Sequence, residues 1–321
     1  MKEQLIKEKR LLDFYKKMVS LSQRNLHSSE KFLDEAFTIM MMGHEFGNGR
    51  LCQRRVYEIL MIWNLSYNSF VDEKNIVTDI ENIIYPFSIV DDSDYYRRIV
   101  TEEHLLLREI FFNCRLADEI ENNRDDSIAF NLLMLKNSSC IEAFNKVVKL
   151  KEIARTGWVK RRVKKEYIES DATHIMQMIG LASAYFSLFK PSDLDYDKVM
   201  EMIIIHEMGE VLAGDIPEGD LLHESKHDIE AQGVREVFNG LSSGDYFINL
   251  WEEFESRESN EARFVYELDK FDPIVKAEYL DEVLGRTDLL SDFYMYEENR
   301  GTFDEGKLKK VFKHLGEKVN R

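Results

Sequence analysis

The sequence predicts an all-α protein, and three observations support this. Only 4 prolines and 15 glycines interrupt the 321 residues, and long stretches are rich in Glu, Lys, Leu, Ile and Met, which favour helices. Hydrophobic residues make up 44% of the chain and aromatic residues 12%, which is enough for a packed core and unlike a disordered protein. The length suits one large domain or two ordinary ones.

The second half of the chain contains two consecutive helical patterns. From Ser170 to Phe189 apolar residues recur at helical intervals, and Lys190-Pro191 ends the pattern because the residue before a proline avoids the helical conformation. We expect a second helix from Asp195 to Leu212, ended by Gly214 and Pro217.

Further helices are expected toward the C-terminus. They cover about Glu224 to Leu241, Asp245 to Ser256, Asn260 to about Pro273, and Asp304 to Val319. The first of them is stopped by Ser242-Ser243-Gly244, and the last has an amphipathic pattern.

The first half is also rich in helical patterns, but it contains a different passage. Gln53 to Trp63 and Val71 to Ile84 read as helices, and Tyr85 to Val100 places two short apolar runs on either side of an acidic turn, as in a β-hairpin. This order of elements predicts a winged helix, faintly similar to the MarR-type DNA-binding fold. A helical accessory or dimerisation domain is the alternative.

We expect a domain boundary near residues 145–152, with a helix-rich N-terminal domain at 1–148 and a second domain at 149–321. The net charge of −17 is uneven: residues 1–150 hold 20 basic and 24 acidic side chains, and residues 151–321 hold 23 and 36. A strongly acidic half repels nucleic acid in general but is compatible with a metal site. Nucleic-acid binding is therefore expected, if at all, from the N-terminal domain.

The chain shows no sign of a membrane or secretory location. No apolar run approaches the roughly eighteen residues of a membrane span, and the charged start does not resemble a signal peptide. Three cysteines, Cys52, Cys114 and Cys140, lack metal-ligand spacing and read as reduced thiols. We expect a cytoplasmic protein.

The segment from Ile205 to Pro217 crowds His206, Glu207, Glu210 and Asp215 onto the end of an apolar helix. Burying ionised groups costs several kcal/mol each unless a counter-charge compensates them, and a divalent metal is the expected counter-charge. Candidates for the remaining ligands are His174 and Asp269, which lie on separate predicted helices. Imidazole and carboxylate ligands suit Mn²⁺, Fe²⁺, Co²⁺, Ni²⁺, Zn²⁺ or Mg²⁺, and helical bundles build metal sites from several helices in this way.

Four blocks of sequence, in order and in spacing, carry a resemblance to a known family. They are Arg155-Thr156-Gly157-Trp158-Val159, Glu169-Ser170-Asp171-Ala172-Thr173-His174, the segment from His206 to Pro217, and Glu261-Ala262-Arg263-Phe264-Val265 leading into Leu268-Asp269-Lys270-Phe271. Together they resemble the HD-domain phosphohydrolases, and most of all their 5′-deoxynucleotidase branch, over about residues 151–300. The resemblance implies a helical bundle. We also expect a homo-oligomer, with a dimer as its form.

By this resemblance, His174, His206, Glu207 and Asp269 hold one divalent metal. Glu210 is then the acid or base, and Asp215 completes the catalytic pair and reads the sugar hydroxyls. Arg155 and Trp158 are implied to contact the phosphate and the sugar of a nucleoside monophosphate. These roles agree with the chemistry of the residues, since a guanidinium suits a phosphate dianion and Glu210 lies on the helical face next to Glu207.

One residue departs from the family pattern. The signature dipeptide is His-Asp, and this chain has His206-Glu207, whose carboxylate is one methylene longer. A literal His-Asp dipeptide does occur at His227-Asp228, but its polar surroundings predict the solvated start of a helix.

Two functions are therefore expected from the sequence. The first is a metal-dependent phosphohydrolase, specifically a 5′-nucleotidase acting on (deoxy)nucleoside monophosphates. The second is a catalytically impaired HD domain that senses a nucleotide, with a first half that binds DNA or a partner. The second follows from the His-Glu departure, since misplacing a catalytic group by an ångström can cost about a hundredfold in rate.

Overall fold

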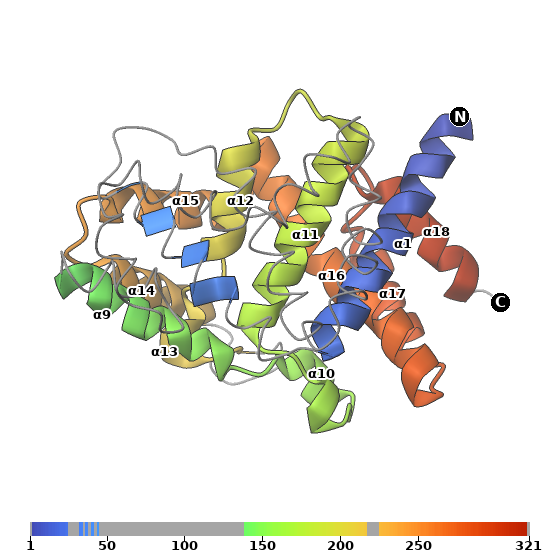
Figure 1. The fold of residues 1–321 in the computed structure, drawn as a ribbon, viewed down its shortest axis with the longest axis horizontal. Helices are drawn as coiled ribbons and strands as arrows, with labels where there is room; N and C mark the ends of the chain where they lie inside the picture. Colours follow the sequence, from blue (N-terminus) through green and yellow to red (C-terminus); the bar gives the residue numbers. More distant parts are fainter. Residues whose placement is uncertain are drawn as a thin grey trace, which may run out of the picture.

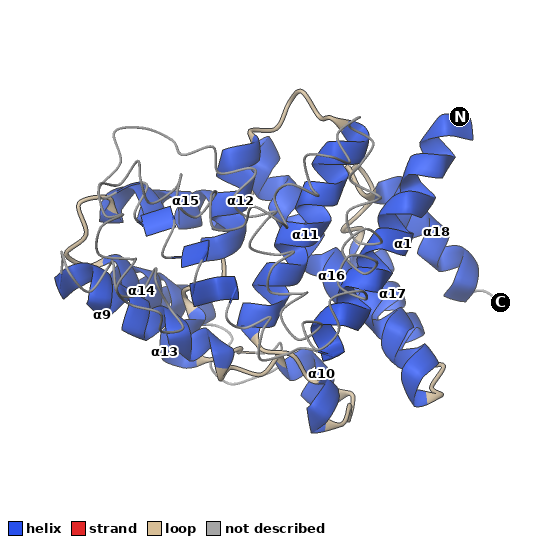
Figure 2. Ribbon diagram, viewed as in Figure 1, coloured by secondary structure: helices blue, strands red, loops and turns tan. Residues whose placement is uncertain are grey.

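The computed structural model describes residues 2–24, 32–34, 36–37, 40–41, 44, 138–216 and 225–319. Within these ranges the chain forms helices joined by short turns and contains no strand; an isolated bridge pairs Ala154 with Ser170. Figure 2 shows the same helical character throughout the described parts. The predicted all-α class is confirmed.

The helices fall at both ends of the chain and throughout its second half. In chain order they are α1 (Lys2–Arg24), α9 (Ser138–Val147), α10 (Thr156–Lys160), α11 (Asp171–Phe189), α12 (Tyr196–Ile205), α13 (Glu210–Ala213), α14 (Lys226–Phe238), α15 (Gly244–Ser256), α16 (Asn260–Leu284), α17 (Leu289–Arg300) and α18 (Lys309–Val319). Short 3-10 helices at Val148–Lys151 and Lys165–Tyr167 join α9 to α10 and α10 to α11.

Helix α11 lies at the centre of the fold, in contact with α1, α12 and α16 (Figure 1). It begins at Ser170, whose hydroxyl accepts a hydrogen bond from the Thr173 amide at 3.4 Å. It ends at Lys190, which takes a left-handed conformation with φ 46° before Pro191. Nearly every residue between these ends is buried, so its polar side chains must find partners inside the protein.

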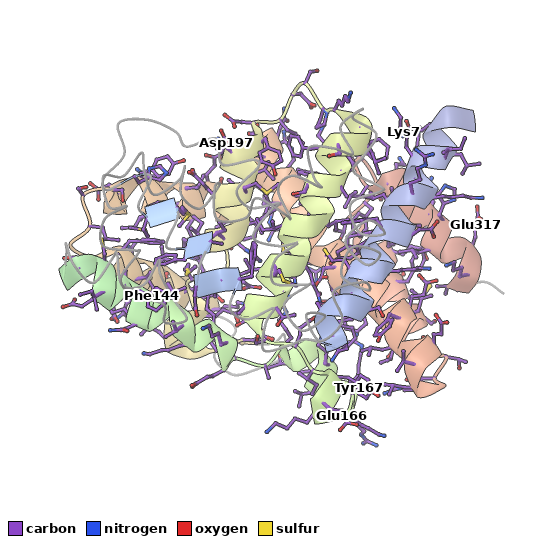
Figure 3. The ribbon with its side chains drawn as sticks, in the orientation of Figure 1. Lys7, Phe144, Glu166, Tyr167, Asp197 and Glu317 are labelled. Carbon is purple, nitrogen blue, oxygen red and sulfur yellow. The ribbon has the colours of Figure 1, made fainter. Side chains whose placement is uncertain are left out.

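Helix α1 packs across α11 and α16, and it also contacts α18, so the two ends of the described chain lie together (Figure 1). Side chains fill the space between these helices (Figure 3). The buried apolar residues of α1 recur at helical spacing: Leu11, Leu12, Phe14, Tyr15, Met18 and Val19. Burial of such side chains stabilises the fold by about 1.5–3 kcal/mol each, so α1 is firmly docked on the second half.

The helix expected from Asp195 to Leu212 is interrupted in the structure. Helix α12 ends at Ile205, residues 206–209 form a turn, and α13 begins at Glu210. The reason is a close approach of backbones: a Cβ atom on Gly209 would lie 2.5 Å from the Cβ of Glu230, and one on Gly233 would lie 2.4 Å from the Gly209 carbonyl oxygen. The turn lets the chain pass this tightly against α14.

Two further differences concern the C-terminal helices. The helix expected to end near Pro273 continues as α16 to Leu284, because Phe271, Ile274 and Val275 on both sides of the proline are packed in the core. Helix α17 was not expected at all, since its sequence has weak apolar periodicity.

Several predictions concern residues outside the described ranges. The helices at 53–63 and 71–84 and the hairpin at 85–100 lie there. The domain boundary at 148/149 stays a prediction, because most of the expected N-terminal domain lies outside the described residues. None of the helices in the described ranges combines the length and the apolar character needed to cross a bilayer.

Candidate metal centre

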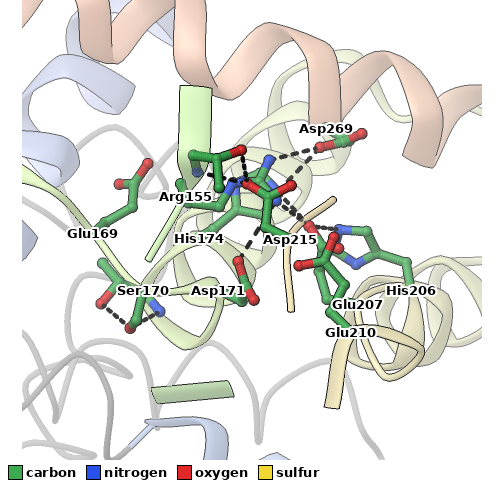
Figure 4. A network of polar contacts seen from close by, with 12 residues as sticks. Arg155, Glu169, Ser170, Asp171, His174, His206, Glu207, Glu210, Asp215 and Asp269 are labelled. Atoms are coloured by element: carbon green, nitrogen blue, oxygen red, sulfur yellow. Dashed lines mark hydrogen bonds and ion pairs between the residues drawn. The ribbon is translucent and has the colours of Figure 1, made fainter. Parts of the chain in front are cut away.

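Three parts of the fold bring the four predicted metal ligands to one point. Helix α11 supplies His174, the turn after α12 supplies His206 and Glu207, and α16 supplies Asp269. Each side chain offers one ligand atom, and these atoms all lie within 4.8 Å of one another. All four residues are buried. Figure 4 shows them converging from separate helices.

The ring of His206 is held with one nitrogen toward this point. Its Nδ1 donates to the carbonyl oxygen of Ile203 at 2.7 Å, one turn earlier on α12. This leaves Nε2 as the atom with a lone pair. Nε2 is buried and has no hydrogen-bond partner among the described residues, and it lies 3.4 Å from Oε1 of Glu207. A buried histidine nitrogen whose ring is oriented by a hydrogen bond from the other nitrogen is typical of a metal ligand.

The ring of His174 is oriented by a different group. Its Nδ1 lies 2.5 Å from Oδ2 of Asp272, a carboxylate that is fully buried on α16. Its Nε2 therefore faces Asp269 Oδ1 at 3.2 Å and Glu207 Oε1 at 3.7 Å. A carboxylate behind a histidine raises the basicity of the ring and fixes the nitrogen that faces a metal.

The donor set and its spacing fit a divalent cation. Two atoms bound at about 2.1 Å to one ion lie at most about 4.2 Å apart, so the observed spread requires only a small contraction. Two imidazole nitrogens and two carboxylate oxygens suit the transition metals and Mg²⁺ expected from the sequence. The side chain of Glu207, despite its extra methylene, turns toward the other three ligands, so the departure from His-Asp does not remove a ligand atom.

Arg155 faces the same point from the N-terminus of α10. Its Nη1 donates to Glu207, and its Nη2 lies 3.3 Å from Oδ1 of Asp269. Burial alone would raise the pKa of both carboxyls. The charge of Arg155, together with His206 beside Glu207 and with Lys270 and His174 beside Asp269, holds both pKa values well below their ordinary range. These carboxylates are ionised and ready to bind a cation.

Two other buried carboxyls of the site have pKa values shifted in the opposite direction. Burial and the charges of Glu207 and Asp171 raise the pKa of Glu210 well above its usual value. Burial and the charge of Glu207 raise the pKa of Asp171, although Arg155, 3.8 Å away, opposes the shift.

The carboxyls of Asp171 and Glu210 lie against each other. With both ionised, neither oxygen of Asp171 and not Oε2 of Glu210 would have a hydrogen-bond donor among the described residues. A proton on either carboxyl would supply one, in agreement with the raised pKa values of the pair.

Asp215 lies beyond the end of α13, where Gly214 takes a positive φ of 70°. Its Oδ2 accepts hydrogen bonds from the Thr156 amide at 2.6 Å and the Thr156 hydroxyl at 2.8 Å. Both bonds end on one oxygen, so Oδ1 stays available to a ligand. Asp215 thereby ties the segment that carries Arg155 to the segment that carries Glu210.

The structure places Trp158 in the core. Its ring is 1% exposed and packs on Phe293, with ring centroids 4.6 Å apart. Its Nε1 donates to Oε1 of Glu169 at 3.0 Å, and Glu169 in turn accepts from the buried Lys276. In this arrangement the indole supports the segment around Arg155, and it can touch a ligand only after the side chains around it move.

Three residues of the site were not singled out from the sequence. Asp171 lies three residues before His174, and Asp272 lies three after Asp269, so helical spacing could have placed each on the same face as a ligand. Lys226, whose Nζ lies 3.8 Å from Oε1 of Glu210, had no local signal. The literal dipeptide His227-Asp228 lies outside the ligand group, and His227 packs on Trp251.

Comparison with known proteins gives matches to about half of the chain. A family model described as HD domain matches residues 147–300. The protein 5′-deoxynucleotidase HDDC2 of Danio rerio is 31% identical over 182 residues, which cover 56% of this chain and 87% of that protein. The protein of the same name from Dictyostelium discoideum is 34% identical over 145 residues, 44% of this chain and 76% of the relative.

A solved structure is also similar. It is a conserved hypothetical protein from Pyrococcus furiosus, 27% identical, with a TM-score of 0.45. The similarity covers 56% of this chain and 99% of that one.

Proposed function

Because this chain belongs to the HD-domain phosphohydrolase family, we propose that it is a metal-dependent enzyme that releases phosphate from nucleoside monophosphates. The relatives from Danio rerio and Dictyostelium discoideum are both named 5′-deoxynucleotidases. We infer the same reaction class here, with a (deoxy)nucleoside 5′-monophosphate as the substrate.

One observation supports this proposal most strongly: two kinds of carboxyl lie in one buried cluster. Glu207 and Asp269 have lowered pKa values and lie with two histidine nitrogens around a common point. Glu210, beside them, has a raised pKa. Carboxyls with pKa values pushed apart in this way are typical of sites in which one group binds charge and the other carries a proton.

His174, His206, Glu207 and Asp269 would hold the divalent metal. When bound, such an ion supplies a Lewis acid that activates water and polarises a phosphoryl group. The identity of the metal stays open among Mn, Co, Fe, Ni, Zn and Mg.

The remaining side chains would bind the substrate and handle its proton. Arg155 presents a guanidinium that can pair with two phosphate oxygens. Glu210, whose pKa is raised by burial and by the charges of Glu207 and Asp171, can carry a proton and give it to the leaving 5′ oxygen of the sugar. Asp215 can accept a hydrogen bond from a sugar hydroxyl through Oδ1. Trp158 would support the segment that carries Arg155.

The test is release of inorganic phosphate from a panel of ribo- and deoxyribonucleoside 5′-monophosphates, with each of the six metals. We expect release that depends on added metal and is abolished by His206→Ala. His227→Ala is the matched control, because this histidine is outside the ligand group. Metal bound at one ion per chain, with no phosphate from any nucleotide, would refute the proposal.

The alternative from the sequence, a nucleotide sensor without turnover, is not favoured, since the relatives are named as nucleotidases. A dimer, a cytoplasmic location and nucleic-acid binding by residues 1–148 stay predictions. The segment on which a winged helix would depend is outside the described residues.

A further inference from the structure

Helix α1 lies outside the segment that matches the HD-domain family, which begins at residue 147. Even so, it packs on α11 and α16, the two helices that carry His174 and Asp269 (Figure 1). Most of its inward face is apolar, but two polar side chains on that face, Tyr15 and Ser22, are fully buried. Buried polar groups need hydrogen-bond partners. Tyr15 and Ser22 find theirs in Asp272 and Gln177, which lie next to the predicted metal ligands.

Tyr15 reaches the metal site through one carboxylate. Its hydroxyl donates to Oδ1 of Asp272, and Oδ2 of the same carboxylate bonds Nδ1 of His174 at 2.5 Å. The other nitrogen of His174 is the one that faces Asp269 and Glu207. Asp272 is 0% exposed, so its two oxygens depend on these protein donors.

Ser22 makes the second contact, through Gln177 of α11. A carboxylate can only accept, so the amide nitrogen of Gln177 must face Asp272 Oδ1, at 3.0 Å, and Glu169 Oε2, at 3.1 Å. In this orientation the amide oxygen accepts from the Ser22 hydroxyl at 2.7 Å. Gln177 lies three residues after His174, on the same face of α11. The two contacts of α1 thus meet at Asp272.

A third contact fixes the end of α1. The side-chain nitrogen of Gln23 donates to the carbonyl oxygen of Glu166 at 3.0 Å, in the loop before α11 that Figure 3 labels at Glu166 and Tyr167. The register of α1 along α11 is therefore set at several points, and the Tyr15 hydroxyl is held on Asp272.

We propose that α1 is a positioning element of the metal site, in which Tyr15 holds Asp272 against His174 and so sets the nitrogen that faces the metal. This inference rests on the proposed metal site. By this inference, a helix at the N-terminal end of the chain positions a metal ligand of the HD domain. Groups that hold a ligand in this way typically contribute about 10- to 100-fold to metal affinity.

The decisive variant is Tyr15→Phe, which keeps the ring and its packing and removes only the hydroxyl. We expect the Kd for Mn²⁺, measured by calorimetry on the full chain, to rise by about 10- to 100-fold. Tyr185→Phe is the matched control: it removes the same atom from a buried tyrosine of α11 that packs on Phe189 and Phe264, away from Asp272. Its Kd should stay within twofold of the wild-type value.

A double-mutant cycle tests the route through Asp272. If Tyr15 acts by holding this carboxylate, Tyr15→Phe adds little to the loss of affinity caused by Asp272→Asn. Independent, additive losses would overturn the proposal. So would an unchanged Kd in Tyr15→Phe, or an equal loss in Tyr185→Phe.

Ser22→Ala provides a second variant should Tyr15→Phe fold poorly. It removes the hydroxyl from which Gln177 accepts a hydrogen bond, and we expect a smaller rise in Kd, of several-fold. An unchanged Kd would contradict the role of α1 in positioning the metal site. Because metal affinity is measured without substrate, the outcome is separate from that of the proposed function. A wild-type chain that binds Mn²⁺ but releases no phosphate refutes the enzyme alone, and one that binds no divalent metal overturns both.

Discussion

The carboxyls on the two sides of the candidate site differ in what faces them. On the metal side, Glu207 and Asp269 lie against Arg155 and the histidines, and their pKa values are lowered. On the acid side, Asp171 and Glu210 lie against each other, and their pKa values are raised. All four carboxyls are buried, so burial alone does not explain shifts of opposite sign.

The comparison shows that the counter-charge decides the role of each carboxyl. Burial favours the neutral form of every one of them. The charge of Arg155, with the histidines and Lys270, keeps the pKa values of Glu207 and Asp269 low, so their oxygens suit a cation. Arg155 also lies 3.8 Å from Asp171, but burial and the charge of Glu207 outweigh it. The pKa values of Asp171 and Glu210 are raised, as a general acid requires. Along the chain, Glu207 and Glu210, one from each side, are only three residues apart.

The largest effect is expected from the metal side. Asp269→Asn keeps the shape of the side chain but removes the charge that binds the cation, so phosphate release should fall by about 10³-fold or more. Metal content measured on the purified variant should fall with it. Asp288→Asn, on an exposed Asp paired with Arg286, is the control and should behave as wild type. Activity within tenfold of wild type would contradict the assignment of Asp269.

A large but separable effect is expected from the acid side. Glu210→Gln removes the proton-carrying group, and kcat should fall by about 10²-fold or more. Metal content should stay at one ion per chain, because Glu210 is not among the four ligands. Loss of metal together with activity would mean that the two sides do not have separate roles.

The close packing of the turn at residues 206–209 can be tested by its effect on stability. Gly209→Ala places a Cβ against the backbone of α14, and overpacking of this kind costs about 1–3 kcal/mol of stability. Chemical unfolding followed by circular dichroism measures it. Gly157→Ala, whose Cβ would meet no atom nearer than 3.8 Å, is the control and should be close to neutral. Equal stability of the two variants would contradict the close packing of the turn.

The smallest effect is expected from Asp171→Asn. The charge of Asp171 helps to raise the pKa of Glu210, so a neutral residue at 171 lowers that pKa. A general acid works below its pKa and fails as pH rises through it. The alkaline limb of the kcat profile should therefore move to lower pH, with less than about a tenfold change in kcat at its maximum. A limb that stays in place, or moves to higher pH, would contradict the pairing of the two carboxyls.

Local patterns in the sequence were enough to predict the helices that end at local signals. The helix expected from Ser170 to Phe189 is confirmed as α11, because both its cap and its stop are encoded nearby. The prediction of one helix from Asp195 to Leu212 is wrong at its C-terminal end. There the chain forms a turn at 206–209, where the backbone at Gly209 packs closely against α14. Such a contact between distant segments leaves no periodic trace.

The same distinction applies to the site. The four metal ligands were predicted from motif blocks, and the structure brings all four together. The groups behind them could be found only in part: Asp272 has helical spacing from Asp269, whereas Tyr15 lies 257 positions from Asp272 and has no motif. Residues that orient ligands are chosen by tertiary contacts, so they need coordinates to be recognised.

The most direct test of this account is anomalous diffraction at the Mn edge from crystals grown with Mn²⁺. We predict one peak per chain, bounded by Nε2 of His174, Nε2 of His206 and the carboxylates of Glu207 and Asp269. A peak elsewhere in the molecule, or a Glu207 side chain turned away from it, would contradict the central claim that these four groups share one cation.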